Sequence, residues 1–138
     1  MQQYPQVSGQ VQLTEDWSIT LPTSFSRRIE DGDLVFWRPG LTLWLAVWDR
    51  PAEETPEETL DWIKSEIPEE AEQVKETKHG SILRIDYQLQ EHDPSRTPPD
   101  YTGHYSFTIG ETSYIQLAAY DDTEKDRKMA ESIVHSLG

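Results

Sequence analysis

Histidines and carboxylates are the residues of this chain that could act on a substrate or hold a metal ion. The four histidines are scattered, and no two have the spacing of a helical metal site: His79, His92, His104 and His135. His104 begins a predicted strand and could approach Asp86 or Glu30 in space, which would give a small hydrolase its acid and base. We interpret His135 as a surface residue and expect no catalytic part for His104.

The run EDGD at residues 30–33 places three carboxylates around a glycine and resembles a fragment of a calcium loop. The full loop spacing with its closing glutamate is missing, and a hairpin turn at Asp31-Gly32 explains the same residues. Cysteine is absent, which excludes disulfides and thiolate zinc sites. The chain contains no nucleophile elbow and no phosphate-binding glycine loop. We therefore predict a protein that is not an enzyme and needs neither metal nor cofactor.

Tryptophan is concentrated in the stretch LVFWRPGLTLWLAVW, residues 34–48, which holds Trp37, Trp44 and Trp48. In an extended strand Trp44 and Trp48 share one face, roughly 13 Å apart. The plain interpretation is that a following helix, which carries Trp62, covers this face. The alternative is an open apolar groove, because exposed aromatic patches mark binding sites and tryptophan dominates interface hot spots.

Acidic residues outnumber basic ones by 26 to 12, for a formal net charge of -14. Phosphate binding needs clustered lysine and arginine, so this balance argues against nucleic acid and against an anionic membrane. It suits a basic protein partner, a cation or simple solubility. Residues 51–76 hold ten of the acidic side chains, among them Glu57, Glu58 and Asp61.

Hydrophobic periodicity predicts the elements that must position these residues. Thr55, Pro56 and Glu58 form a capping box ahead of an apolar stripe, which indicates an acidic helix ending near Ile67. Thr123 with Asp126 caps a second helix. Alternating runs predict strands, which we place at residues 17–22, 24–29, 34–38, 41–48, 82–90, 103–109 and 112–120. We predict an α+β fold: a largely antiparallel sheet of about six or seven strands, flanked by the acidic central helix and a C-terminal helix.

Domain organisation is predicted to be simple. Residues 1–12 are polar and lack periodicity, so we expect a flexible tail followed by one domain over residues 13–138. The first residues do not resemble a secretory signal, and no apolar stretch reaches the roughly 20 residues that cross a bilayer. A cytoplasmic bacterial protein is the expected setting.

Several segments resemble the PsbP-like fold group in their order and pattern. These are DWSITLPTSF, EDGDLVFW, the proline-capped acidic helix, and SYIQLAAYDD leading into DRKMAESIVHSL. The resemblance implies an antiparallel sheet flanked by helices and a mostly non-enzymatic role. Members include photosystem accessory proteins, a Ran-binding protein and small acidic bacterial chaperones of type VI secretion effectors. No binding motif of the group can be matched residue by residue.

The sequence thus favours a non-catalytic protein-binding module, a chaperone or adaptor that shelters an apolar segment of a secreted effector. The predicted partner-binding residues are four tryptophans and three acids: Trp37, Trp44, Trp48, Trp62, Glu57, Glu58 and Asp61. The alternative is an immunity-type inhibitor whose acidic surface plugs the basic site of a toxin or enzyme. An apolar sheet face or strand edge could also make a homodimer.

Overall fold

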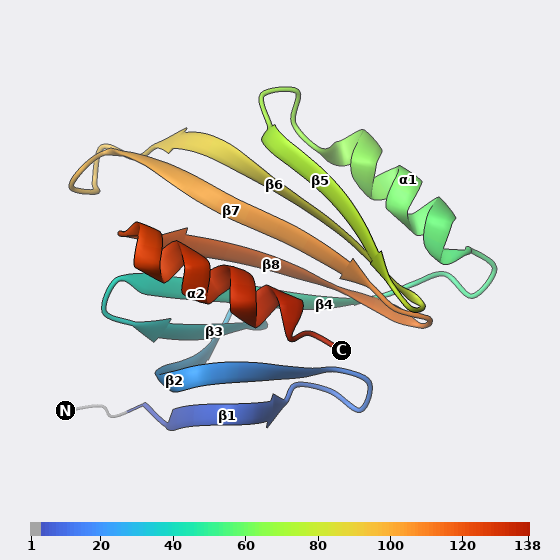
Figure 1. Ribbon diagram of the computed structural model, residues 1–138, viewed down its shortest axis with the longest axis horizontal. Coiled ribbons are helices and arrows are strands. Elements are labelled where there is room, and N and C mark those ends of the chain that lie inside the picture. The colour runs from blue at the N-terminus through green and yellow to red at the C-terminus, as the bar shows by residue number, and fades with distance from the viewer. Residues whose placement is uncertain (1–3) are drawn as a thin grey trace. The chain divides into compact units, whose positions relative to one another are not determined.

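The computed structural model describes residues 4–138. Eight strands and two short helices follow one another along the chain (Figure 1): β1 (Gln6–Gln12), β2 (Ser18–Glu30), β3 (Asp33–Arg38), β4 (Leu41–Asp49), α1 (Pro56–Glu66), β5 (Glu72–His79), β6 (Ile82–His92), β7 (Asp100–Ile109), β8 (Ser113–Asp121) and α2 (Glu124–His135). The described part of the chain has no helix that is both long and apolar enough to span a membrane.

The predicted fold class is wrong in its element count and balance. Residues 4–138 form a mostly antiparallel sheet of eight strands and only two short helices, of 11 and 12 residues, in place of six or seven strands flanked by an acidic central helix. The strands β1, β2, β3 and β4 are successive neighbours, and so are β8, β7, β6 and β5. The sheet is therefore the dominant element, and the helices are additions to it.

Two strands were missed and two predicted strands are one. Residues 6–12, expected to be a flexible tail, form β1 because their backbone pairs with β2 from Ser18 to Ser26. The sequence predicts one strand ending at Pro22 and another from residue 24, yet β2 runs through Pro22 without a break. It is tolerated because it lies where the β1 register shifts between Val7 and Gly9, and because β3 pairs only with residues from Ser26 onward.

The described residues form two compact units, and the single domain over 13–138 stays a prediction. One unit comprises residues up to Ala46 together with Ala119–Gly138, and the other comprises Val47–Ala118. In the first unit α2 packs on β2. The prediction for α2 is confirmed: the Thr123 hydroxyl accepts a 3.1 Å hydrogen bond from the Asp126 amide, and Ala130, Ile133 and Val134 are buried.

The predicted hairpin at EDGD is confirmed in the same unit. Glu30 pairs with Asp33 across the two turn residues Asp31 and Gly32, whose φ angles are 53° and 88°. Both angles are positive, as a type I′ hairpin turn requires. The turn therefore accounts for these acidic residues. Within residues 4–138, no three histidine or carboxylate side chains are grouped so that they could hold a metal ion.

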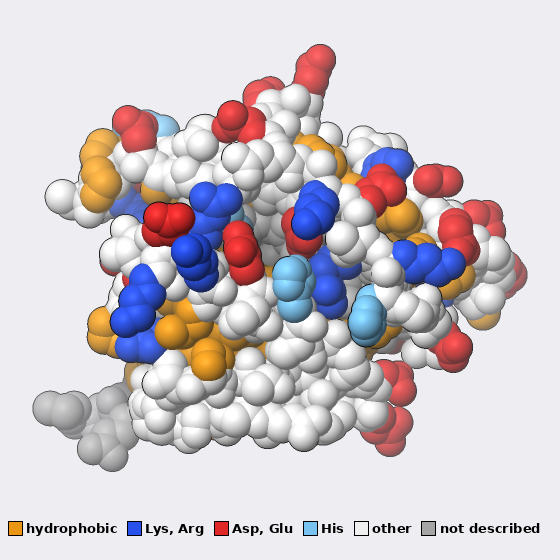
Figure 2. Space-filling model, viewed as in Figure 1, with side chains coloured by type: hydrophobic (Ala, Val, Ile, Leu, Met, Phe, Trp, Pro, Cys, Tyr) orange, Lys and Arg blue, Asp and Glu red, His pale blue; other side chains and the backbone are white. Residues whose placement is uncertain are grey.

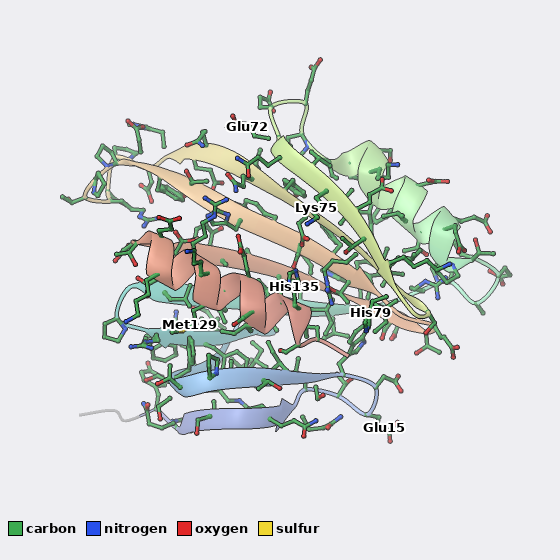
Figure 3. All side chains as sticks on the ribbon, in the orientation of Figure 1. Glu15, Glu72, Lys75, His79, Met129 and His135 are labelled. Atoms are coloured by element: carbon green, nitrogen blue, oxygen red, sulfur yellow. The ribbon has the colours of Figure 1, made fainter. Side chains whose placement is uncertain are left out.

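The second unit contains α1, and its predicted capping box is confirmed. The Thr55 hydroxyl accepts from the Glu58 amide, and the Glu58 carboxylate accepts from the Thr55 amide, each at 3.1 Å. The helix packs on β6 and β7 through Ile63, which is buried with Leu83, Ile85 and Ile109. The outer strand β5 has every residue exposed, and Figure 3 shows Glu72, Lys75 and His79 along it.

Candidate binding site

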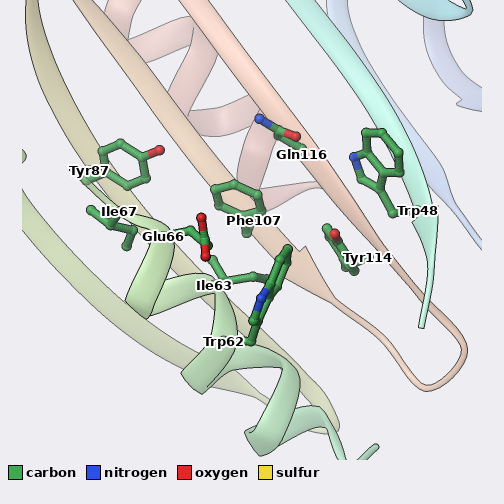
Figure 4. A pocket seen from close by; sticks show the side chains of 9 residues that line it. All are labelled: Trp48, Trp62, Ile63, Glu66, Ile67, Tyr87, Phe107, Tyr114 and Gln116. Atoms are coloured by element: carbon green, nitrogen blue, oxygen red, sulfur yellow. The ribbon is translucent and has the colours of Figure 1, made fainter. Parts of the chain in front are cut away.

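A hollow of about 330 Å³ lies in the second unit, between α1 and the sheet strands of that unit. Figure 4 shows its walls, in which Tyr114 lies between the indoles of Trp62 and Trp48 in this view. Five of the nine lining side chains are aromatic, and only one is charged: Trp48, Trp62, Ile63, Glu66, Ile67, Tyr87, Phe107, Tyr114 and Gln116. We call this feature the aromatic hollow. Its size lies at the lower end of the range for ligand pockets, roughly 300–1,000 Å³.

The helix α1 supplies one wall because of its residue spacing. Its apolar residues Ile63 and Ile67 face the sheet and are buried or half-buried. Trp62 and Glu66 are four residues apart and therefore neighbours on the helix surface, at the margin of that apolar stripe. Trp62 is 53% exposed, although it lines the hollow. The helix thus presents an indole and a carboxylate side by side at the rim.

The strands supply the floor and the other wall. Trp48, near the end of β4, is 50% exposed. Phe107 and Tyr114 are half-buried, with ring centroids 6.2 Å apart, and Tyr87 stacks on Tyr105 at 5.4 Å. The floor therefore consists of packed rings, whereas the two indoles are open to solvent.

Both phenols in the hollow have a raised pKa in the folded protein. Burial raises the pKa of Tyr87, and the nearby Glu91 carboxylate raises it further. Burial, with a smaller contribution from Glu54, likewise raises the pKa of Tyr114. Glu66 is the only acidic or basic residue among those that line the hollow.

Arg50 holds the segment between β4 and α1 in place. Its side chain is buried and donates to the Thr59 hydroxyl at 2.9 Å, the Gly110 carbonyl at 3.0 Å and the Glu54 carbonyl at 2.6 Å, and also to the Glu111 carbonyl. These acceptors come from the segment before α1, from the N-terminal part of α1 and from the β7–β8 turn. Arg50 thus fixes the start of α1, and with it the position of the helix wall.

The predicted tryptophans divide into two pairs. Trp48 and Trp62 line the aromatic hollow, whereas Trp37 and Trp44 lie in the first unit and are half-buried. There the guanidinium carbon of Arg28 lies 4.5 Å from the Trp37 ring centroid and 5.9 Å from that of Trp44. Tyr4 meets Trp37 edge to face at 4.9 Å. The Trp37 and Trp44 indoles therefore have partners within the chain.

The predicted acidic residues lie on the exposed side of α1. Glu57, Glu58 and Asp61 are exposed, and Glu58 is bound in the capping box. Glu57 instead lines a second, polar hollow of about 360 Å³ together with Arg50, Glu54 and Lys78. Figure 2 shows acidic side chains gathered around the position of α1, with apolar atoms between them.

The hydrolase alternative places His104 and Asp86 on one face of β6 and β7. His104 pairs with Gln88, and Asp86 pairs with Ser106, so the histidine and the aspartate are diagonal neighbours on that face. Neither residue lines the aromatic hollow or the polar hollow. His79, His92 and His135 are exposed. The described hollows therefore bring no histidine together with a carboxylate.

Sequence reasoning missed most of the hollow's floor. Phe107 and Gln116 come from strands whose partners cannot be read from the sequence, and Glu66 was hidden in a run of acids that indicated a solvated face. Tyr87 and Tyr114 could be recognised as aromatic residues of the later strands, and the spacing of Trp62 and Glu66 was a further signal. No protein-family model matches the chain, and no curated protein sequence matches it.

Proposed function

We propose that the protein is a non-catalytic protein-binding module that takes an apolar segment of a partner into the aromatic hollow. The observation that carries the proposal is the half-exposed state of Trp48 and Trp62 on the rim of a single apolar hollow. Each indole is about half exposed, so it forgoes part of the roughly 1.5–3 kcal/mol gained by fully burying a large apolar side chain, and binding a partner recovers that part. Trp is also the residue type most enriched at interface hot spots.

The form of the hollow allows an apolar side chain of the partner segment to enter it. The hollow is open on the side of the two indoles and closed below by packed rings, so a side chain can enter without rearrangement of the core. A role as a chaperone or adaptor for a secreted effector, and the resemblance to the PsbP-like group, stay predictions.

A neutral environment-sensitive dye tests whether the hollow accepts apolar groups. We expect Nile red fluorescence to rise when the dye binds the wild-type protein. The apparent affinity for the dye should be about tenfold lower in Trp48→Ala and in Trp62→Ala, since each indole contributes on the order of 1–2 kcal/mol at a hot spot. Ile29→Ser is the matched control, because Ile29 is 70% exposed and lies outside the hollow. Equal dye binding by all four proteins would contradict the proposal.

Salt separates this function from the acidic-inhibitor alternative. Binding through the indoles should survive high ionic strength, because apolar burial is not screened. An inhibitor acting through Glu57, Glu58 and Asp61 should lose affinity steeply with salt, since these side chains are exposed and their charges are screened over about 8–10 Å. A partner whose affinity follows salt and those three residues, and ignores the indoles, would favour the alternative.

A further inference from the structure

The first unit contains a complete recognition site for arginine, filled by the chain itself. The Arg28 guanidinium lies over the Trp37 ring at 4.5 Å and near the Trp44 ring at 5.9 Å. The same guanidinium donates to one Glu30 oxygen from Nε at 3.0 Å and from Nη2 at 2.8 Å. Two indoles and one glutamate thus satisfy both the π-face and the charge of the cation.

The aromatic hollow contains the same three groups without the cation. Trp48, Trp62 and Glu66 all line it, and no lysine or arginine is among its lining residues. The nearby cations are engaged elsewhere: Arg50 donates to Thr59 and to backbone carbonyls, and the Lys64 ammonium lies 2.6 Å from the Glu76 carboxylate. The lining residues of the hollow therefore supply no cation of their own to pair with Glu66.

We propose that the aromatic hollow binds an arginine side chain, carried by the apolar segment of the partner protein; this inference rests on the proposed function. The guanidinium lies against the Trp62 indole and pairs with the carboxylate of Glu66, its neighbour on α1, while an apolar side chain of the segment packs on Trp48. The methylene stem of the arginine, or an apolar neighbour, packs on the rings and on Ile63 and Ile67.

The electrostatics of the hollow favour a cation there. Glu66 is the last residue of α1, so the partial negative charge of the helix C-terminus adds to that of its carboxylate. Tyr87 and Tyr114 are uncharged at neutral pH because the ordinary pKa of tyrosine is about 10, and their rings line the hollow as apolar walls. The formal net charge of -14 draws a basic segment toward the protein over longer distances.

Arginine fits this chemistry better than lysine. Its planar guanidinium is weakly hydrated, stacks on aromatic faces and can donate two hydrogen bonds to one carboxylate. A lysine ammonium is strongly hydrated and would lose more on entering a hollow with a single carboxylate. The preference is therefore a measurable property of the site.

Selection from random short peptides displayed on phage tests the inference, with the Trp48→Ala and Trp62→Ala proteins used for counter-selection. We expect enriched peptides to contain an arginine flanked by apolar residues. Enrichment of apolar peptides without arginine would overturn the inference and leave the proposed function standing. Enrichment that does not depend on either tryptophan, or no enrichment at all, would overturn both.

Matched synthetic peptides then measure the contribution of the guanidinium. Replacing arginine by citrulline keeps the shape and removes the charge, and we expect a loss of about tenfold in affinity, equivalent to one cation–π contact with a charge-assisted pair. Lysine should bind about threefold to tenfold more weakly than arginine.

The variant Glu66→Gln should weaken the arginine peptide by roughly threefold to tenfold and leave the citrulline peptide unchanged. Asp61→Asn is the control, because Asp61 is exposed on the same helix and does not line the hollow. Equal losses in the two variants would reduce the effect to net charge and overturn the role of Glu66. Circular dichroism of both variants confirms that α1 is intact.

Discussion

The guanidinium carbon of Arg28 lies 4.5 Å above the ring of Trp37, and the same group is paired with Glu30 at 2.8 Å. Arg28 lies on β2 and Trp37 lies on the neighbouring strand β3, which pairs with β2 residues from Ser26 to Glu30. The contact explains why an indole that looked available in the sequence is half-buried by a charged side chain of its own chain.

The first prediction concerns this stack. Arg28→Lys keeps the charge but loses the planar contact, so we expect the free energy of unfolding to fall by about 0.5–1 kcal/mol. Urea denaturation followed by tryptophan fluorescence measures the change. Arg27→Lys, one residue away and so on the opposite face of β2, should have a smaller effect. Equal effects of the two variants would show that the stack contributes nothing.

The second prediction concerns Arg50. Arg50→Lys cannot reach the Thr59 hydroxyl and the surrounding carbonyls together, so buried acceptors lose their donors, and we expect a loss of more than about 2 kcal/mol in the free energy of unfolding. Arg127→Lys is the control, since the Arg127 Nε lies 3.5 Å from the Glu131 carboxylate in a surface pair worth about 0–1 kcal/mol. Similar denaturation midpoints for the two variants would contradict the anchoring role of Arg50.

The third prediction uses two glycines with the same backbone conformation. Gly32 and Gly40 both have a φ of 88°. A Cβ added to Gly40 would lie 2.6 Å from the Asp126 Oδ2 atom, whereas a Cβ added to Gly32 would have no atom within 4 Å. We expect each substitution to cost about 1–2 kcal/mol for the positive φ, and Gly40→Ala to cost a small further amount because the end of the Asp126 side chain must turn away. Thermal or urea unfolding measures both. Adding Asp126→Ala should recover the excess only in the Gly40 variant, and no recovery there would argue against the clash.

The fourth prediction concerns pH. Because the pKa of Tyr87 is raised in the folded protein, the folded state binds more protons than the unfolded state once the pH passes the ordinary tyrosine value of about 10. Its stabilising contribution is therefore complete below that pH and is lost as the pH rises through the folded value. Ultraviolet difference spectra, with Tyr87→Phe used to assign the signal, should show this late ionisation.

A matched pair of variants tests the causes of that shift. Glu91→Gln should move the Tyr87 pKa only part of the way back, because burial is the larger cause. Glu54→Gln should instead affect Tyr114. An unchanged Tyr87 titration in Glu91→Gln would remove the charge contribution from the account.

Local signals in the sequence predicted the caps and turns well. The Thr55–Glu58 box, the Thr123 cap and the Asp31-Gly32 turn depend on residues within a few positions of each other, and all are present. The strand count failed where the deciding contacts are distant. β1 exists through its pairing with β2, and β5 has no buried residue to give it an alternating pattern.

Burial of polar residues also lay beyond the sequence. Period-two alternation puts Arg84 on the face of β6 that also carries Asp86 and Gln88, yet Arg84 is only 7% exposed and donates from Nε to the Thr108 hydroxyl at 3.0 Å. That partner lies 24 positions away, on β7. The same distance effect divided the tryptophans: spacing grouped Trp44 with Trp48, while Arg28 on β2 and Trp62 on α1 decided their surroundings.

The fully exposed strand β5 has a consequence for colloidal behaviour. It ends the sheet order, so one row of its backbone amides and carbonyls lacks a neighbouring strand, which is the arrangement that templates cross-molecule β stacking. Lysines and glutamates along it, with an irregularity between Glu72 and Lys75, act as gatekeepers against such growth. Neutralising those charges would leave Val74 on an uncharged edge strand, and we expect such a variant to precipitate at lower protein concentrations than the wild type.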